Sequence, residues 1–87
     1  MIQGDRPVSQ SRAYSVVLHP EPEGGFTVRV PAFPEIVTYG GNEQDALTMA
    51  REAIELSVEY RLAQGDDVPT GDATLLRTVS VALPTAA

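Results

Sequence analysis

One long helical pattern, preceded by three short strand patterns and followed by one more, constrains the fold of this chain more than any other feature. Residues 43–64 carry apolar or small side chains three and four positions apart, the spacing that forms one face of an α-helix. This face consists of Ala46, Leu47, Ala50, Ile54, Ser57, Val58 and Leu62. Asn42 is a candidate N-cap that Asp45 is placed to complete as a capping box, and Gly65 is a candidate C-terminal cap. Because an amphipathic helix must bury its apolar face, the rest of the chain is expected to supply a sheet.

Four segments alternate apolar and polar residues as half-buried strands do: residues 13–19, 26–30, 36–39 and 74–83. Between the second and third of these, Pro31 and Pro34 predict an interruption of regular pairing, because proline has no amide hydrogen to donate. The order β-β-β-α-β predicts a two-layer α+β domain with one helix on a four-stranded, mainly antiparallel sheet. We expect an N-terminal arm over residues 1–12, this domain over 13–84 and a short tail over 85–87.

A sheet that one helix covers on one side keeps its other face and its edges available for pairing. The face opposite the helix is predicted to carry Val17, Leu76 and Ala82 among polar residues. We therefore expect a homo-oligomer, either a dimer or a tetramer.

The net charge of the chain indicates which kind of partner it can bind. Twelve acidic residues oppose six arginines and no lysine, which gives a formal net charge of −6 at pH 7. Direct binding of DNA or RNA requires a basic face, so it is not expected. An acidic surface instead suits a basic protein partner, although the same charge also serves solubility.

Other classes of protein are excluded by what the sequence lacks. It contains no cysteine and one histidine, which excludes disulfide scaffolds and sites rich in cysteine or histidine ligands, and no cofactor is expected. No apolar run approaches the roughly 20 residues of a membrane span. The polar first dozen residues do not resemble a signal peptide, so we expect a cytoplasmic protein without a membrane partner.

The pattern of acidic and histidine residues gives little support for an enzyme. The β-β-β-α-β order also begins the ribonuclease H fold, but the first and last predicted strands carry none of the acids that hold its metal ions. Double-stranded RNA-binding domains share the order too, yet this helix begins with acidic residues where phosphate binding needs basic ones. A hydrolase that uses His19 as a base remains a weak alternative, and no catalytic or metal-binding residue is assigned.

The strongest candidates for partner binding lie on two predicted loops. Glu21 and Glu23 in the first loop and Glu35 after the second are interpreted either as surface charges that serve solubility or, with the two loops close together, as an acidic patch for a basic partner. Phe33 and Pro34 lie beside Glu35 on a rigid loop. Phe33 is interpreted either as a core residue or as an interface anchor, and the sequence does not separate the two.

Several motifs in their order resemble HicB-like antitoxins. The run YSVVLHP at residues 14–20, followed by EGGF at 23–26, is similar to the family's tyrosine-led strand and acidic glycine turn. VRVPAFPE at 28–35 is similar to the V-P-D-L-P-G loop, although Ala32 replaces the usual Asp and Glu35 the usual Gly. VTYG, NEQDAL and AREAI, at residues 37–40, 42–47 and 50–54, resemble the segments that follow in the family.

The resemblance implies a partial ribonuclease H-like fold without its metal site, and a protein that binds HicA-type toxins. These toxins are small basic ribonucleases that cleave messenger RNA. Many members also carry a C-terminal DNA-binding domain, which we expect to be lacking here because the fourth predicted strand ends close to Ala87. The alternative is an orphan homo-oligomeric module of the same family that has no toxin.

Overall fold

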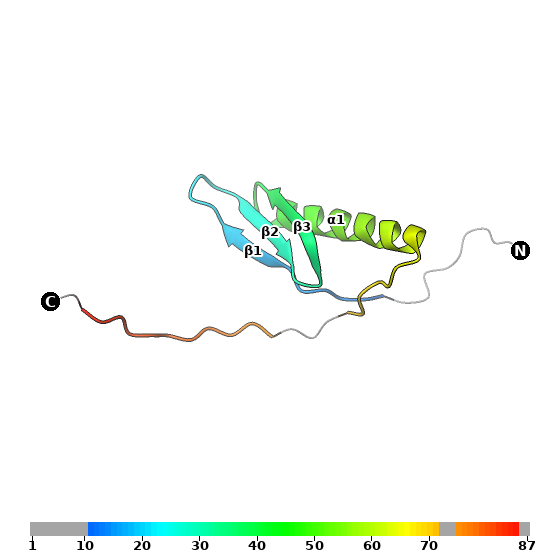
Figure 1. Ribbon diagram of the computed structural model, residues 1–87. Helices are drawn as coiled ribbons and strands as arrows, with labels where there is room; N and C mark the ends of the chain where they lie inside the picture. Colours follow the sequence, from blue (N-terminus) through cyan, green and yellow to red (C-terminus); the bar gives the residue numbers. More distant parts are fainter. Residues whose placement is uncertain (1–10, 72–74, 86–87) are drawn as a thin grey trace, which may run out of the picture.

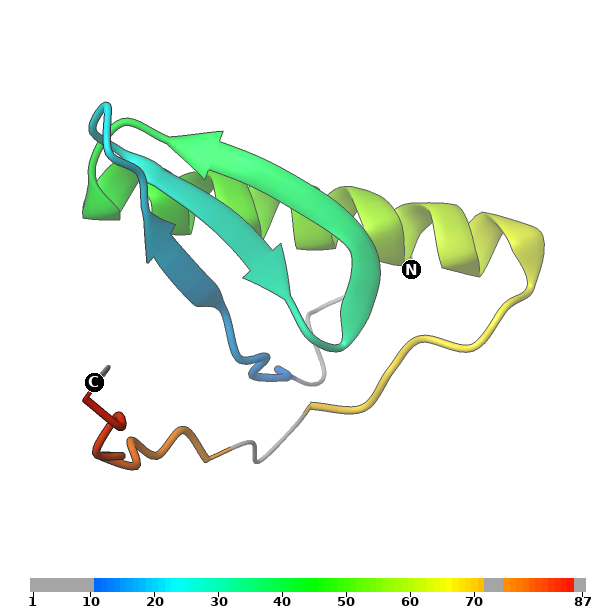
Figure 2. The same cartoon turned by 60° about the vertical axis from the view of Figure 1, so that its left-hand side comes forward.

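The computed structural model describes residues 11–71 and 75–85 and contains three strands and one helix in that part of the chain (Figure 1). The strands β1 (Val17–Pro20), β2 (Phe26–Val30) and β3 (Phe33–Gly40) precede the helix α1 (Glu43–Gln64). They lie in the order β1-β2-β3, and both pairs are antiparallel. Figure 2 shows α1 lying across one face of this sheet, so the predicted two-layer α+β arrangement is confirmed.

The third strand is longer than the sequence predicted. It begins at Phe33, where the predicted strand began at Ile36, because Pro31 and Ala32 alone make the turn and Phe33 then pairs with Val30. The register shifts between Arg29 and Val30, so the prolines produce a local irregularity and do not end the pairing.

The helix has the predicted bounds, because the signals at both ends are local. The side-chain oxygen of Asn42 accepts a hydrogen bond from the backbone amide of Asp45 at 2.8 Å, which confirms the N-cap. Gly65 adopts φ 74°, and its amide donates to the carbonyl of Leu62. This left-handed conformation is unfavourable for residues with a side chain, so glycine suits the position.

The core lies between α1 and the sheet and is small. Its fully or nearly fully buried residues are Val28, Val30, Phe33, Ile36, Ala46 and Ala50. The helix approaches β3 closely at Gly40, where an added Cβ would lie 2.3 Å from Cα of Ala46. A chain of this size with so few buried side chains has modest stability of its own.

The predicted fourth strand is not formed in the structure. Thr74, its first residue, lies outside the described residues, and residues 75–85 contain no strand. This segment lies apart from the domain in both views (Figures 1 and 2), and its large apolar side chains are exposed, from 67% at Leu76 to 84% at Leu83. Among residues 11–71 and 75–85 the sheet therefore has three strands, and the predicted fourth strand is not confirmed. In the described residues, no helix is long and apolar enough to cross a membrane.

Candidate partner-binding surface

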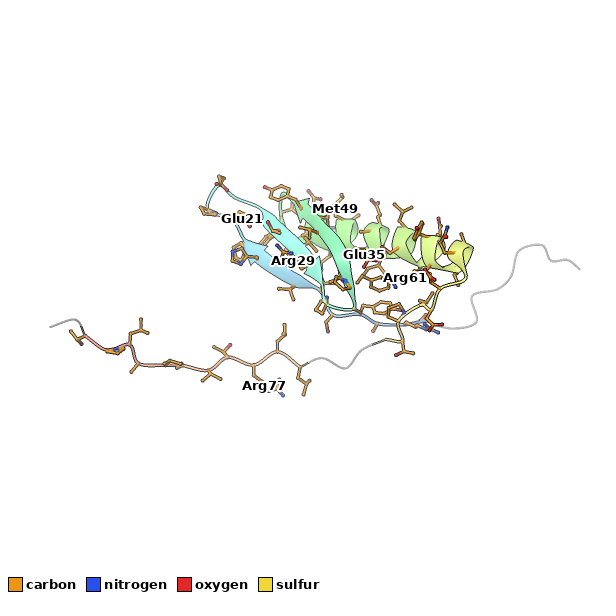
Figure 3. The ribbon with its side chains drawn as sticks, viewed as in Figure 1. Glu21, Arg29, Glu35, Met49, Arg61 and Arg77 are labelled. Atoms are coloured by element: carbon orange, nitrogen blue, oxygen red, sulfur yellow. The ribbon has the colours of Figure 1, made fainter. Side chains whose placement is uncertain are left out.

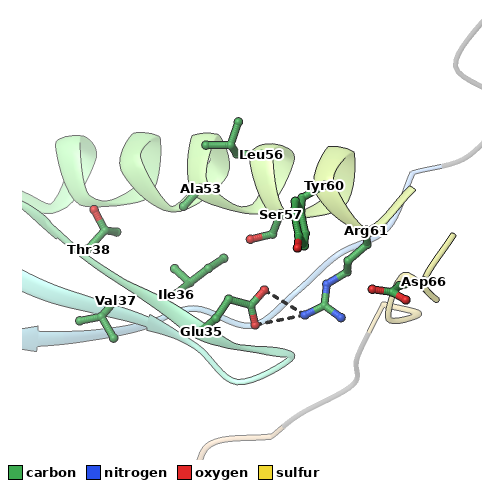
Figure 4. A pocket seen from close by; sticks show the side chains of 10 residues that line it. All are labelled: Glu35, Ile36, Val37, Thr38, Ala53, Leu56, Ser57, Tyr60, Arg61 and Asp66. Atoms are coloured by element: carbon green, nitrogen blue, oxygen red, sulfur yellow. Dashed lines mark hydrogen bonds and ion pairs between the residues drawn. The ribbon is translucent and has the colours of Figure 1, made fainter. Parts of the chain in front are cut away.

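A groove runs between the outer edge of β3 and the C-terminal half of α1 (Figure 4), and we name it the β3–α1 groove. Its lining residues are Glu35, Ile36, Val37, Thr38, Ala53, Leu56, Ser57, Tyr60, Arg61 and Asp66. It encloses about 670 Å³ and opens widely to solvent. Leu56 and Tyr60 lie one helical turn apart and are 68% and 64% exposed, so two large apolar side chains line it without being covered.

An ion pair closes one end of the β3–α1 groove. Nη2 of Arg61 donates to both carboxylate oxygens of Glu35, at 3.1 and 2.9 Å. A hydrogen bond from the backbone of Glu35 itself lowers the pKa of its carboxyl group below the usual 4.5. Partial burial raises this pKa, while the hydrogen bond and the positive charge of Arg61 lower it, and the net shift is downward. Glu35 therefore enters any contact as a carboxylate already paired with a guanidinium.

Arg61 also joins this ion pair to the core. Its guanidinium carbon lies 5.1 Å from the centre of the Phe33 ring. The same ring meets Tyr14 edge to face, with centroids 5.0 Å apart and an interplanar angle of 80°. The sequence left open whether Phe33 is a core residue or an interface anchor. Its side chain is completely buried, so it is a core residue.

The predicted acidic patch is not a single patch. Glu21 and Glu23 lie in the turn before β2, where Glu21 accepts a hydrogen bond from the Thr27 hydroxyl at 2.6 Å. Glu35 lies at the other end of β2, because the register pairs Phe26 with Gly40 and Val30 with Phe33. Figure 3 shows Glu21 at the end of the sheet where β2 begins and Glu35 toward the other end. The expectation that the two loops would meet was wrong, since an antiparallel hairpin places successive turns at opposite ends.

Pro34 is exposed and does not line the β3–α1 groove, but it borders a small separate hollow with Val17 and Arg29. Glu21, Glu23, Pro34 and Glu35 remain predicted partner contacts that the geometry does not test. His19 is exposed and pairs in the sheet with Thr27. Within residues 11–71 and 75–85, no group of three histidine, cysteine or acidic side chains could hold a metal ion.

A second groove, missed by the sequence analysis, lies on the other side of the helix, beside the segment that leads into β1. We name it the β1–α1 groove, and it consists of two adjoining hollows that share Arg12, Tyr14, Ile54 and Glu55. Its other lining residues are Ser11, Val16, Leu47, Ala50, Arg51, Val58, Glu59, Leu62 and Val68. The sequence did contain a signal for this groove, because Leu47 and Leu62 belong to the predicted apolar face of the helix. In the structure the sheet does not cover them, and they are 45% and 64% exposed.

The segment after the helix crosses the end of the β1–α1 groove. Nη1 of Arg12 donates to the carbonyl oxygens of Val68 and Pro69, at 3.2 and 3.0 Å. The hydroxyl of Tyr14 donates to the same Pro69 carbonyl. These bonds fix the chain beside the start of β1, immediately before the exposed C-terminal segment.

The comparisons with known proteins agree on one family. The profile of the family described as the HicB_like antitoxin of bacterial toxin-antitoxin systems matches residues 13–87. Antitoxin HicB 1 of Photorhabdus laumondii is 33% identical over 64 residues, which cover 74% of this chain and 41% of that protein. The chain thus matches less than half the length of this relative.

A second relative is matched over most of its length. UPF0150 protein Ta0767 of Thermoplasma acidophilum is 30% identical over 60 residues, which cover 69% of this chain and 87% of that protein. No solved structure matches the chain. The family profile covers almost the whole described fold, from the residue before Tyr14 through the helix to the C-terminal segment. The chain belongs to the HicB-like antitoxin family.

Proposed function

We propose that this chain is an antitoxin that binds a HicA-type toxin, a small basic ribonuclease, and blocks it by covering the surface that cuts RNA. The β3–α1 groove carries the proposal, because it combines uncovered apolar side chains with acidic groups at its rim. Family membership supplies the class of partner. The proposal assigns no reaction to the chain itself.

Charge supports the encounter between the two proteins. The net charge is −6, and Glu52, Glu55 and Glu59 form an exposed acidic row along the solvent side of α1. A basic partner is attracted to such a surface over about 8–10 Å at ordinary ionic strength. Attraction of this kind raises the association rate and makes it sensitive to salt.

Contact in the β3–α1 groove supplies the affinity. Leu56 and Tyr60 are suited to the centre of an interface, where a few large side chains that lose their water carry most of the binding energy. Asp66 and the Glu35–Arg61 pair lie at the end of the same groove. A basic side chain of the toxin placed there would meet carboxylates at the rim of the contact.

The test is binding of a HicA-type toxin from the same genome to the purified chain, together with cleavage of an RNA by that toxin. We expect Leu56→Asp to weaken binding by about tenfold or more, a cost typical of a central interface contact. Thr48→Asp is the matched control, because it adds the same charge at an exposed helical position outside the groove, and it should change affinity by less than about twofold.

Three results would contradict the proposal. The first is that no such toxin binds the chain, which would leave the orphan module as the better description. The second is that Leu56→Asp and Thr48→Asp weaken binding equally, which would place the contact elsewhere. The third is that the complex forms while RNA cleavage continues at full rate, which would rule out occlusion.

A further inference from the structure

A second apolar stripe runs along α1, outside the face that packs on the sheet. We name it the outer stripe, and its residues are Met49, Ala53, Leu56, Tyr60 and Ala63. They are spaced alternately by four and three residues, which is the heptad spacing of helices that pair side by side. Met49 is 39% exposed, Leu56 and Tyr60 are more exposed, and Leu56 points away from the sheet (Figure 4). The described part of the chain thus leaves this apolar surface uncovered.

Acidic side chains follow the same period along one border of the outer stripe. Asp45, Glu52 and Glu59 are seven residues apart, so they lie nearly in one line on the helix, and all three are exposed. We name them the acidic border. When Met49 and Leu56 take the d positions of the heptad, the acidic border takes the g positions, which face the flank of a paired helix. The β3–α1 groove lies on the opposite border of the stripe.

We propose that the outer stripe receives an amphipathic α-helix of the partner protein, which carries an apolar seam and basic residues along its flank. This inference rests on the proposed function, because the toxin is the basic protein that would supply the helix. The helix would lie alongside α1, with its seam on Leu56 and Tyr60 and its basic flank against the acidic border. Burial of the large apolar side chains supplies affinity, and the charged flank selects the partner.

Charge argues against a second copy of this chain as the occupant. In an antiparallel pair of identical helices, g positions face g positions, so the acidic borders of the two copies would repel each other. In a parallel pair the acids would face the e positions, which here are Ala50, Ser57 and Gln64. None of these three carries a positive charge, and Ala50 is buried against the sheet. A helix that brings its own basic residues satisfies the border.

The spacing of the outer stripe favours a helix over an added strand. A strand laid along the outer edge of β3 would lie in the β3–α1 groove, and Met49 does not line that groove. Met49 instead extends the stripe toward the start of α1 (Figure 3), so that Met49 to Tyr60 spans about three helical turns. A stripe of this length with heptad spacing matches the seam of a second helix. Met49 therefore discriminates between the two kinds of partner.

The first test uses a synthetic peptide as the probe, so it does not depend on any toxin. The peptide consists of three heptads with leucine at a and d, lysine at e and g, and alanine elsewhere. The lysines on both flanks oppose pairing of the peptide with itself. Fluorescence anisotropy measures its dissociation constant from the full chain. We expect it to bind, and the same peptide with glutamate at e and g to show no measurable binding.

Substitutions in the outer stripe locate the contact. Met49→Asp and Leu56→Asp should each weaken binding of the lysine peptide by about tenfold or more, because each places a charge in the apolar seam. Neither residue belongs to the buried core, so the domain should still fold. Thr48→Asp is the matched control, because it adds the same charge at an exposed position beyond the acidic border, and it should not weaken binding.

Charge reversal tests the acidic border. Glu52→Lys and Glu59→Lys should each weaken binding of the lysine peptide by about three- to tenfold at low salt. This loss should shrink at about 1 M salt, where charges are screened within about 3 Å. Glu55→Lys is the matched control, because it makes the same change at an exposed position of the same helix that lies off the border. It should weaken binding by less than about twofold.

The opposite results overturn the proposal. A lysine peptide that does not bind, or that binds no better than the glutamate peptide, would refute it. So would equal losses for Met49→Asp and Thr48→Asp, or for Glu52→Lys and Glu55→Lys, because the contact would then lie off the stripe.

The same variants, measured with a HicA-type toxin from the same genome, separate this inference from the proposed function. We expect the toxin to lose affinity in the same order as the lysine peptide. A toxin that is weakened by Leu56→Asp but not by Met49→Asp would refute the helix and leave the proposed function standing. A lysine peptide that behaves as expected while no toxin binds would refute the proposed function and leave the outer stripe as a site for another basic helix.

Discussion

Replacing Phe33 by leucine tests whether the contacts of its ring hold the two layers together. The side chain is fully buried, packs edge to face on Tyr14 and lies under the guanidinium of Arg61. Leucine retains most of the apolar volume but offers no ring to either neighbour. Loss of the aromatic pair costs about 0.5–1.5 kcal/mol, and loss of the cation–π contact costs about 0.5–1 kcal/mol. The free energy of unfolding should therefore fall by about 1–2.5 kcal/mol, and by about 3–5 kcal/mol for Phe33→Ala, which also leaves a cavity.

Urea unfolding followed by far-ultraviolet circular dichroism measures this free energy, at one fixed protomer concentration because association would also stabilise the fold. Tyr14→Leu, alone and combined with Phe33→Leu, completes a double-mutant cycle. The expected coupling energy between the two rings is about 0.5–1.5 kcal/mol. A Phe33→Leu variant that loses less than about 0.5 kcal/mol, with no coupling to Tyr14, would refute the reasoning and leave simple burial as the explanation.

Three further predictions concern the helix cap, the ion pair and the contact between layers. Asn42→Ala should lower the free energy of unfolding by about 1 kcal/mol, and Asn42→Ser should restore most of it, as measured by urea unfolding. Because the pKa of Glu35 is lowered in the folded chain, its carboxylate stabilises the fold above its unfolded pKa, and this contribution is lost as the pH falls through the folded pKa. The stability difference between the wild type and Glu35→Gln should thus be constant near neutral pH and shrink in acid; a difference that does not change would contradict this. Gly40→Ala should cost about 1–3 kcal/mol, because its new Cβ would lie 2.3 Å from Ala46, whereas Gly41→Ala meets nothing closer than 3.9 Å and should fall within about 0.5 kcal/mol of the wild type. Thermal unfolding measures both variants. Equal changes of melting temperature for Gly40→Ala and Gly41→Ala would contradict this prediction, because they would mean that the helix moves away from the new Cβ at little cost.

Features that depend on neighbours in sequence were predictable. Asn42 and Gly65 fix the ends of the helix through bonds within one turn, so both bounds were confirmed. The existence and the antiparallel pairing of the three strands were also predicted, because their alternation and their turn residues lie in the same short segments, but β1 begins at Val17 and not at Ala13. The start of β3 was missed, since a register shift allows Phe33 to pair despite the flanking prolines.

Features that depend on distant parts of the chain were not predictable. The sequence of residues 75–83 fits a strand, but a strand exists only where another strand accepts its hydrogen bonds, and no local pattern says whether such a strand is available. Whether Glu21 and Glu35 meet depends on which end of the sheet each turn occupies. The burial of Phe33 depends on Tyr14, a residue that lies before the first strand.

The core between helix and sheet is filled by small side chains at one end and by large ones at the other. Near the start of α1, Ala46 and Ala50 rest on Val28 and on the bare backbone of Gly40. Toward the end of the helix, Ile54 and Val58 pack on the cluster that contains Phe33. The layers are thus spaced by alanine at one end and by a phenyl ring at the other. The separation of the helix from the sheet is consequently set inside the protein: a change of core volume would reshape the surface between the two layers although none of the residues on that surface had changed.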